Sequence, residues 1–185
     1  MSKKKELEVE LKKEGDKRKN SNKIGATFEQ RIQKVLDELR EEKVCIINKI
    51  PTEIRMVRGA RGRIVSAFPV KESAWLDFHG YAKGMGIFFE AKTHQGKTSF
   101  PISNFSDYQI PLMEEYISYG CKGFIIVEFR ALDRIFILEV GVLKDILEHL
   151  DRKSIPLVTF ENKGIELGNL NELKDFIKSL TNRCK

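Results

Sequence analysis

The stretch WLDFHGYAKGMGIFFEAK, residues 75–92, decides the fold that this sequence predicts. Its two halves, WLDFHGY and GIFFEAK, are rich in aromatic and other apolar residues, and the short segment AKGM joins them. Two such runs around a short glycine-containing linker predict an antiparallel β-hairpin. In that hairpin Asp77 can meet Glu90, because residues directly opposite each other on paired strands are close neighbours.

The second strand of the hairpin carries two charged residues inside an apolar run. Side chains alternate between the faces of a strand, so Glu90 and Lys92 project from one face, and Phe89 and Ala91 project from the other. Two neighbouring carboxylates raise each other's pKa and therefore need a proton, a lysine or a cation between them. An apolar strand makes this need greater, because a buried unpaired charge is costly.

These residues predict a site for a hard divalent cation. Mg²⁺, for which Mn²⁺ can substitute, binds one or two carboxylates and keeps positions for water and phosphate oxygens. Lys92 could orient or deprotonate the water that attacks phosphorus, which gives phosphodiester hydrolysis by in-line attack. The alternative for Asp77, Glu90 and Lys92 is a surface salt-bridge ladder, since this spacing also occurs by chance. The apolar second strand favours the cation site.

The segments around the hairpin predict an α/β fold with a mixed central sheet flanked by helices. Apolar positions at helical spacing predict helices over residues 25–42, 106–120, 142–152 and 170–180. Apolar and β-branched runs predict strands over residues 44–50, 122–129, 134–140 and 157–160. The phenylalanines of the strands are expected in the core: Phe88, Phe89, Phe124, Phe129 and Phe136.

Positive charge is concentrated in two segments of a chain whose formal net charge is +6. Residues 1–23 hold nine Lys/Arg against five Asp/Glu, and residues 51–73 hold five against two, so the remainder is about −1. Such segments attract polyanions, which makes nucleic acid or an anionic membrane face the candidate partner. The alternative for residues 1–23 is a solvated tail with no specific partner.

The sequence contains no apolar stretch long enough to span a membrane and no apolar segment typical of a secretory signal. Cys45, Cys121 and Cys184 are an odd set without metal-site or redox-pair spacing, so we expect free thiols in a reducing compartment. These features predict a cytoplasmic protein without a membrane partner.

An ordered series of motifs resembles the RecU family of Holliday junction resolvases, nucleases of the PD-(D/E)xK superfamily. The series is GATFE (25–29), INKIPT (47–52), Asp77 with FEAK (89–92), and KTSFP (97–101) followed by Asn104, Phe105 and Gln109. The resemblance implies a restriction-endonuclease-like sheet with a protruding basic β stalk. Residues 1–22 alternate charge signs and carry little apolar content, so we expect a basic, disordered tail or a loosely held helix before a nuclease domain over residues 23–185. The resemblance implies a stalk insertion in that domain at about residues 53–73.

The resemblance also implies roles for individual residues. Asp77, Glu90 and the main-chain carbonyl of Ala91 would bind the metal, and Lys92 would handle the attacking water. Glu29 would complete the acidic cluster through a metal-bound water, and Gln109 would contact the scissile strand or its water. The alternatives are a solvated helix residue for Glu29 and a polar residue at a helix N-terminus for Gln109. The DNA contacts would come from Arg55, Arg58, Arg61, Arg63, Lys71, Lys97 and Thr98.

The stretch IRMVRGARGRIVSAF, residues 54–68, looks like the stalk that this family inserts into the opening of a four-way junction. Its strand-like halves enclose an Arg-rich tip, where glycines permit close approach to phosphates. The alternative is a merely solvated basic hairpin.

The chain departs from the family pattern just before its catalytic aspartate. The family generally has a hydroxyl residue there, whereas Trp75 and Leu76 precede Asp77 in this sequence. Ser73 is the nearest hydroxyl and lies too far away, so metal affinity or cleavage preference could differ. Trp75 itself could pack under the sheet or stack on an unpaired base. A second departure is Lys23-Ile24 before Gly25, where the family generally has Asn-Arg.

The resemblance predicts a homodimeric, Mg²⁺-dependent endodeoxyribonuclease that binds four-way DNA junctions by shape and nicks two strands symmetrically. A two-fold dimer suits a junction, because both present two equivalent sites. A recombinase or a branch-migration protein could be a further partner. The alternatives are a nuclease of the same superfamily that acts on other DNA, and a junction-binding protein with little catalysis.

Overall fold

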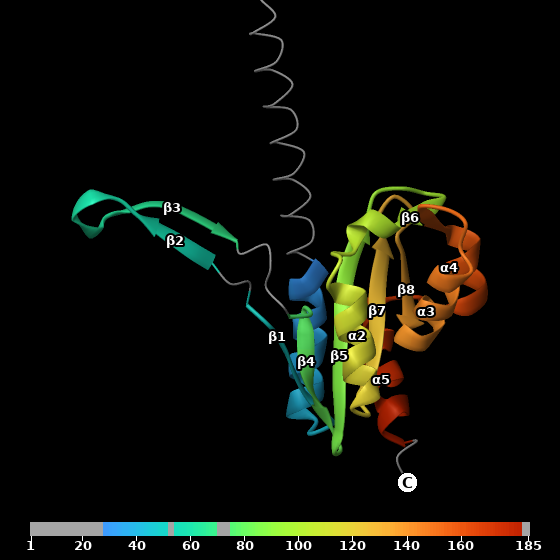
Figure 1. The fold of residues 1–185 in the computed structure, drawn as a ribbon. Coiled ribbons are helices and arrows are strands. Elements are labelled where there is room, and N and C mark those ends of the chain that lie inside the picture. Colours follow the sequence, from blue (N-terminus) through green and yellow to red (C-terminus); the bar gives the residue numbers. More distant parts are fainter. Residues whose placement is uncertain (1–27, 52–53, 70–74, 183–185) are drawn as a thin grey trace, which may run out of the picture.

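The computed structural model describes residues 28–51, 54–69 and 75–182. Within them a six-stranded sheet has the order β1-β4-β5-β7-β8-β10 (Figure 1). Only β5 and β7 are parallel among the pairs of this sheet, so the predicted mixed sheet is confirmed. The strands are β1 (Ile46–Lys49), β4 (Phe78–Ala82), β5 (Met85–His94), β7 (Lys122–Phe129), β8 (Arg134–Glu139) and β10 (Ile165–Leu167).

The predicted hairpin is formed by β4 and β5. Ala82 pairs with Met85, so Lys83 and Gly84 make a two-residue turn. Both turn residues have positive φ, 47° and 85°, which matches the type I′ turn that suits the twist of a hairpin. The register then pairs Phe78 with Phe89, and this places Asp77, one residue earlier, opposite Glu90. The predicted meeting of these two residues is confirmed.

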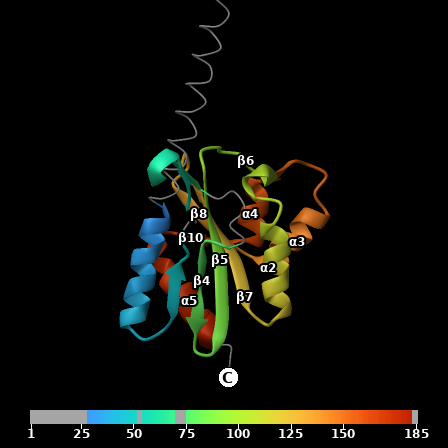
Figure 2. The ribbon, with the colours of Figure 1, turned by 60° about the vertical axis from the view of Figure 1, so that its left-hand side comes forward.

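Helices cover both faces of the sheet (Figures 1 and 2). A first helix, described over residues 28–41, and α5 (Leu173–Asn182) pack on one face, where the rings of Phe78, Phe89 and Phe124 stack. The other face carries α2 (Gln109–Ser118), α3 (Val140–Glu148) and α4 (Leu157–Lys163). All five strand phenylalanines expected in the core are buried. No helix among the described residues is long and apolar enough to span a membrane.

The predicted strand over residues 157–160 is wrong. The strand is β9 (Ser154–Pro156), which pairs with β6 (Ser99–Pro101), and residues 157–160 begin α4. Pro156 is extended and precedes the first helical residue, so it ends the strand at the point where the helix starts. Phe160 is fully buried on one face of that short helix. A four-residue apolar run is too short for its periodicity to distinguish a strand from a helix.

The segment predicted to be a stalk is a separate two-stranded sheet that projects from the body of the protein (Figure 1). β2 (Ile54–Arg58) and β3 (Ile64–Pro69) are antiparallel, and a 3-10 turn (Ala60–Gly62) forms the tip. The two predicted strands are therefore confirmed. The predicted tail over residues 1–22 lies outside the described residues. Cys45 and Cys121 are free thiols as expected, and Cys184 also lies outside the described residues.

Gly80 allows β1 to pair with β4, and we expect Gly80→Ala to lower the free energy of unfolding by about 2 kcal/mol or more. A Cβ atom there would lie 1.9 Å from the carbonyl oxygen of Ile46 and 2.5 Å from the Cα of Ile47, and main-chain atoms cannot move aside without breaking the pairing. Denaturant unfolding measures the change. Gly141→Ala is the control, because a Cβ in that helical position meets nothing within 4 Å and should be neutral or stabilising. Equal effects at both positions would contradict the argument.

Candidate active site

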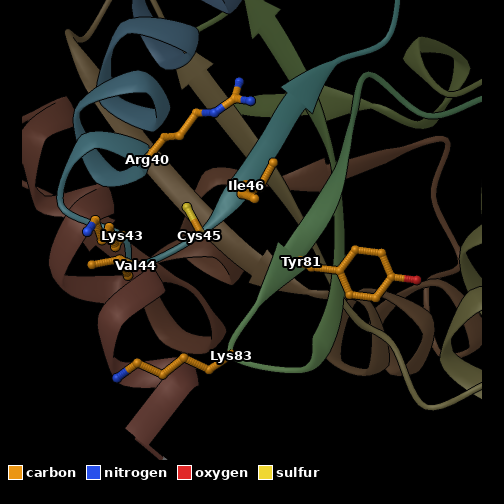
Figure 3. Close-up of a pocket in the computed structure, with 7 residues that line it drawn as sticks. All are labelled: Arg40, Lys43, Val44, Cys45, Ile46, Tyr81 and Lys83. Atoms are coloured by element: carbon orange, nitrogen blue, oxygen red, sulfur yellow. The ribbon is translucent and has the colours of Figure 1, made fainter.

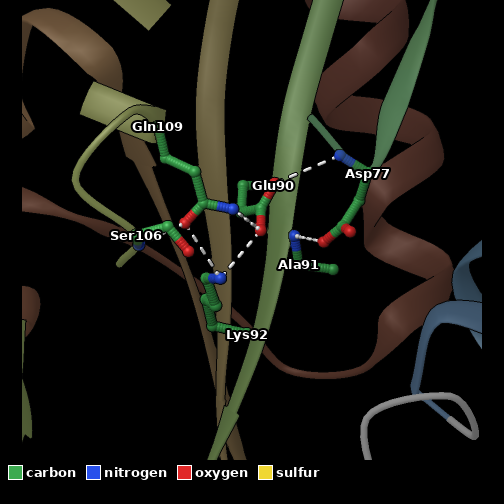
Figure 4. Close-up of polar contacts among 6 residues, drawn as sticks. All are labelled: Asp77, Glu90, Ala91, Lys92, Ser106 and Gln109. Carbon is green, nitrogen blue, oxygen red and sulfur yellow. Dashed lines mark hydrogen bonds and ion pairs between the residues drawn. The ribbon is translucent and has the colours of Figure 1, made fainter. Parts of the chain in front are cut away.

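Asp77 and Glu90 are hydrogen-bonded across the hairpin at the end opposite its turn (Figure 4). The main-chain N–H of Asp77 donates to Glu90 Oε2 at 3.1 Å. The main-chain N–H of Ala91 donates to Asp77 Oδ2 at 2.9 Å. Each carboxylate is therefore held by the backbone of the opposite strand, so both positions follow from the register of the hairpin.

A lysine and a glutamine hold Glu90 from the side of α2 (Figure 4). Lys92 Nζ lies 2.7 Å from Glu90 Oε1, and Gln109 Nε2 donates to the same oxygen at 2.5 Å. Gln109 Oε1 accepts from Lys92 Nζ at 3.2 Å and from the main-chain N–H of Ser106 at 2.9 Å. Glu90 is 2% exposed and Gln109 4% exposed. The first residue of α2 is thus built into the cluster, and its amide is engaged with protein groups.

Burial and neighbouring carboxylates act together on Asp77. Burial is the main cause that raises the pKa of Asp77 to about 8, and the charge of Glu90 is the next. The charge of Glu29 raises this pKa further, whereas the Ala91 N–H and the charge of Lys92 oppose the shift. The site therefore resists holding both carboxylates as free anions, and a bound cation would relieve their repulsion.

Glu29 reaches the site from the first helix through Lys49. Glu29 Oε2 lies 2.7 Å from Lys49 Nζ, at the end of β1. The next residue, Ile50, donates its main-chain N–H to the carbonyl of Asp77 at 2.7 Å. These contacts bring Glu29 close enough to influence Asp77, but a lysine already pairs with its carboxylate.

The oxygen ligands that the site can offer suit a hard cation that takes most of its ligands from water and substrate. No group of three His, Cys, Asp or Glu side chains that could hold a metal occurs among the described residues. Asp77 and Glu90 supply two carboxylates, and the Ala91 carbonyl lies on the same edge of β5 as the N–H that bonds Asp77. Two acidic ligands are what Mg²⁺ uses when waters and phosphate oxygens complete its shell.

Most residues expected to contact DNA are exposed. Arg55, Arg58, Arg61 and Arg63 are exposed on the stalk, where Arg58 Nη1 donates to the Gly62 carbonyl at 3.1 Å. Lys97 and Thr98 are exposed in the loop between β5 and β6. Lys71 lies outside the described residues.

A second buried glutamate was missed from the sequence. Glu128 on β7 is 5% exposed, and its Oε1 lies 2.7 Å from Arg31 Nη1 on the first helix. Arg130 Nε lies 4.0 Å from Glu128 Oε2. The signal was present, because Glu128 interrupts the apolar strand KGFIIVEF as Glu90 interrupts GIFFEAK. Glu128 pairs with Thr93, the residue after Lys92 on β5, so it lies on the strand next to the one that carries the site.

Of the two residues before Asp77 that differ from the family pattern, Leu76 is a core residue and Trp75 is a surface residue. Leu76 is fully buried in the cluster beneath α2. Trp75 is 55% exposed, so the expectation that it could pack under the sheet is wrong. Leu76 and Phe78 are buried in different core clusters, so strict strand alternation does not extend through Asp77 to Trp75.

A groove of about 480 Å³ lies near the turn of the hairpin, at the end of β4 away from Asp77 (Figure 3). Its charged lining residues among the described ones are Arg40, Lys43 and Lys83, beside Cys45 and Tyr81. A groove lined by cations without a carboxylate offers no ligands for Mg²⁺. The candidate active site is therefore the carboxylate cluster at the other end of the hairpin.

The raised pKa of Asp77 predicts a pH-dependent effect on stability. Between about pH 4 and pH 8 the unfolded chain loses the Asp77 proton while the folded chain keeps it, so folding becomes less favourable as the pH rises. Asparagine cannot ionise, so in EDTA Asp77→Asn should exceed the wild type in free energy of unfolding by a margin that grows over this range. At pH 8 the margin should be on the order of a few kcal/mol.

Urea unfolding in EDTA at pH 5 and pH 8 measures this margin. Asp151→Asn serves as the control, because Asp151 is exposed in a loop. A margin for Asp77→Asn that is the same at both pH values would contradict the prediction.

Comparison with known proteins gives one consistent result. The family model described as "Recombination protein U" (RecU) matches residues 23–181. Holliday junction resolvase RecU of Pediococcus pentosaceus is 35% identical over 149 residues, which are 74% of this chain and 72% of that protein. The protein of the same name from Geobacillus sp. is 31% identical over 147 residues, 76% of this chain and 73% of that protein.

A solved structure is also similar to this chain. It is that of Hjc, a Holliday junction resolvase from Archaeoglobus fulgidus, with 14% identity and a TM-score of 0.44. The match covers 81% of this chain and 99% of that one.

Proposed function

The chain belongs to the RecU family, and from this premise we propose that it is a DNA endonuclease that resolves four-way Holliday junctions by hydrolysing phosphodiester bonds. The observation that carries the proposal is the hydrogen-bonded cluster of Asp77, Glu90 and Lys92 at one end of the central hairpin. Two carboxylates can bind a divalent cation and a lysine can orient the attacking water, and this combination suits metal-dependent phosphodiester hydrolysis.

Asp77, Glu90 and the carbonyl of Ala91 are proposed to hold Mg²⁺, for which Mn²⁺ can substitute. When bound, the ion supplies positive charge that stabilises the phosphate in the transition state. The raised pKa of Asp77 supports this assignment, because burial and the charge of Glu90 disfavour the free anion of Asp77, and a bound cation would stabilise that anion. Glu29 is proposed to contribute through a water molecule, since its carboxylate pairs with Lys49 and still influences Asp77.

Lys92 is proposed to orient the attacking water. An ammonium group has three N–H donors, and Glu90 and Gln109 accept two of them. The third can be directed to a water molecule or to a phosphate oxygen. Gln109 acts as a positioning residue in this proposal, because it links Glu90 to Lys92 and is too buried to serve as an open DNA contact.

The stalk is proposed to enter the opening of the junction, where the phosphates of four strands converge. Its arginines are exposed and it projects from the body, which supports this placement (Figure 1). Lys97 and Thr98 would contact phosphates near the cut strand. A homodimer acting in the cytoplasm is part of the proposal, because two symmetric nicks require two equivalent sites.

The decisive experiment compares cleavage of a four-way junction with cleavage of a linear duplex of the same arm sequence, in Mg²⁺ and in Mn²⁺. We expect paired nicks in opposite strands of the junction and little cleavage of the duplex. Preference for the linear duplex would reject the resolvase function and favour another DNA substrate for the same site. Binding of the junction without cleavage in either metal would instead indicate a junction-binding protein.

The triple variant Arg58→Ala, Arg61→Ala, Arg63→Ala should bind the junction more weakly and with a smaller salt dependence. Each lost phosphate contact reduces the slope of log K against log salt by about 0.9. Titrations at several salt concentrations measure both quantities. The double variant Arg152→Ala, Lys153→Ala removes exposed positive charge from a loop of the body and should leave the slope nearly unchanged. Equal slopes for the triple variant and the wild type would mean that these three arginines do not contact DNA phosphates.

A further inference from the structure

Trp75 is an exposed aromatic residue in the segment that leads into the carboxylate cluster. It is 55% exposed and precedes Asp77 by two residues. A tryptophan that is more than half exposed gains only part of the free energy that full burial of its ring would contribute to folding. The side chain therefore calls for an explanation outside the fold itself.

The indole ring is held in a defined place by His79. The ring centroids of Trp75 and His79 lie 6.0 Å apart with an interplanar angle of 73°. Residues four apart in an extended strand are about 13 Å apart at their Cα atoms, and a bend at Asp77 shortens this distance. The bend thus brings the indole back towards the residues that follow Asp77.

The ring of His79 is in turn in contact with aromatic rings that extend into the core. His79 packs edge-on against Tyr116 of α2 at 5.0 Å, and Tyr116 contacts the buried Phe88 at 5.0 Å. Exposure falls along this row from Trp75 to Phe88, so the exposed ring is connected to the core through rings that are more buried. An edge-on contact covers at most one face of the indole, which leaves the other face open to a planar ligand.

We infer that Trp75, held by His79, is a stacking site for an unpaired nucleobase of the strand that is cut. This inference rests on the proposed function and specifies the nucleotide environment of that site. Base-aromatic stacking accepts every base, because each base has a π face. Trp75 lies between the stalk and Asp77 in the chain. Since the stalk and Asp77 are both proposed to contact the junction, the planar group closest to Trp75 would be a base next to the cut phosphate.

Stacking at this position would select junctions over continuous duplexes. In an intact duplex both faces of each base are covered by neighbouring base pairs, and exposing one costs stacking free energy. At the exchange point of a four-way junction the stack is already interrupted. Stacking on the indole therefore favours binding at the exchange point, where a base is accessible without the loss of stacking free energy.

The chain contains a single tryptophan, so its fluorescence reports on Trp75 alone. In EDTA, where strands stay uncut, we expect titration with a four-way junction to quench this fluorescence in parallel with a gel mobility shift. A matched linear duplex should quench it much less at equal occupancy. A series of junctions with one abasic nucleotide at successive positions around the cut should relieve the quenching at one position, which identifies the stacked base.

Variants separate stacking from other roles of this side chain. Trp75→Ala should weaken junction affinity roughly 5- to 150-fold, whereas Trp75→Phe should retain most of it. Tyr119→Ala is the control, since Tyr119 is 80% exposed at the end of α2 and should leave affinity unchanged. Circular dichroism checks that all three variants are folded.

Three results would overturn the inference while leaving the resolvase function intact. The first is junction binding without any change in fluorescence, and the second is wild-type affinity for Trp75→Ala. Quenching that no abasic position relieves would also overturn it. Failure of the wild-type protein to bind or cut any junction would overturn both proposals together.

Discussion

Asp77→Asn is expected to lower the rate of junction cleavage by about 10³-fold or more while leaving junction affinity nearly unchanged. A bound metal contributes several kcal/mol to the transition state of phosphodiester hydrolysis, and each 1.4 kcal/mol is a factor of ten in rate. Asparagine keeps an oxygen that can accept the Ala91 N–H, so the hairpin should keep its geometry. What the substitution removes is the negative charge that binds the cation.

Single-turnover cleavage over a range of Mg²⁺ and Mn²⁺ concentrations measures this effect, and a gel mobility shift in EDTA measures affinity. The variant should show both a lower cleavage rate and a higher metal concentration at half-maximal rate. Asp151→Asn is the matched control and should cleave at the wild-type rate, because Asp151 is an exposed loop residue. A fully active Asp77→Asn protein would remove Asp77 from the metal site and with it the proposed chemistry.

Lys92→Met should reduce the cleavage rate by about 10²- to 10⁴-fold, the range expected for loss of a group that acts on the attacking water. Methionine retains an unbranched apolar stem, while the contacts of Lys92 Nζ with Glu90 and Gln109 are lost. Gln109 still donates to Glu90 Oε1, so that carboxylate keeps a partner and should still bind metal.

The two substitutions can be distinguished by their metal dependence. Lys92→Met should remain slow at saturating Mg²⁺ with a half-saturating concentration close to that of the wild type, whereas Asp77→Asn should shift that concentration. Lys97→Met is the control for loss of a lysine charge near the site, and it should alter affinity more than the maximal rate. A Lys92→Met protein whose rate is restored by added Mg²⁺ would mean that Lys92 supports metal binding rather than the water.

The structure also limits how far the predicted roles extend. Gln109 was expected to contact the scissile strand or its water, and the structure places it behind Glu90 with its amide engaged by Glu90, Lys92 and Ser106. Its proposed role is therefore to keep Glu90 and Lys92 in register. The sequence contained no means to locate this contact, because Gln109 begins α2 whereas its partners Glu90 and Lys92 lie on β5.

Local patterns in the sequence were sufficient for the hairpin and its chemistry. Alternation along a strand and a two-residue turn together determine which residues face one another, and both act over fewer than twenty residues. Asp77 therefore had to meet Glu90 once residues 75–92 formed a hairpin. The same local reasoning identified the two strands and the arginine-rich tip of the stalk.

Tertiary structure decided whatever depends on packing between distant segments. The parallel pairing of β5 with β7, the arginines around Glu128, and the helix over residues 157–163 belong to this group. Trp75 belongs to it as well, because its exposure and its contact with His79 are not set by the strand pattern alone. The sequence by itself determined which groups form the site, since neighbours along a hairpin are set by short-range geometry, and the fold decided which partners from elsewhere in the chain support them.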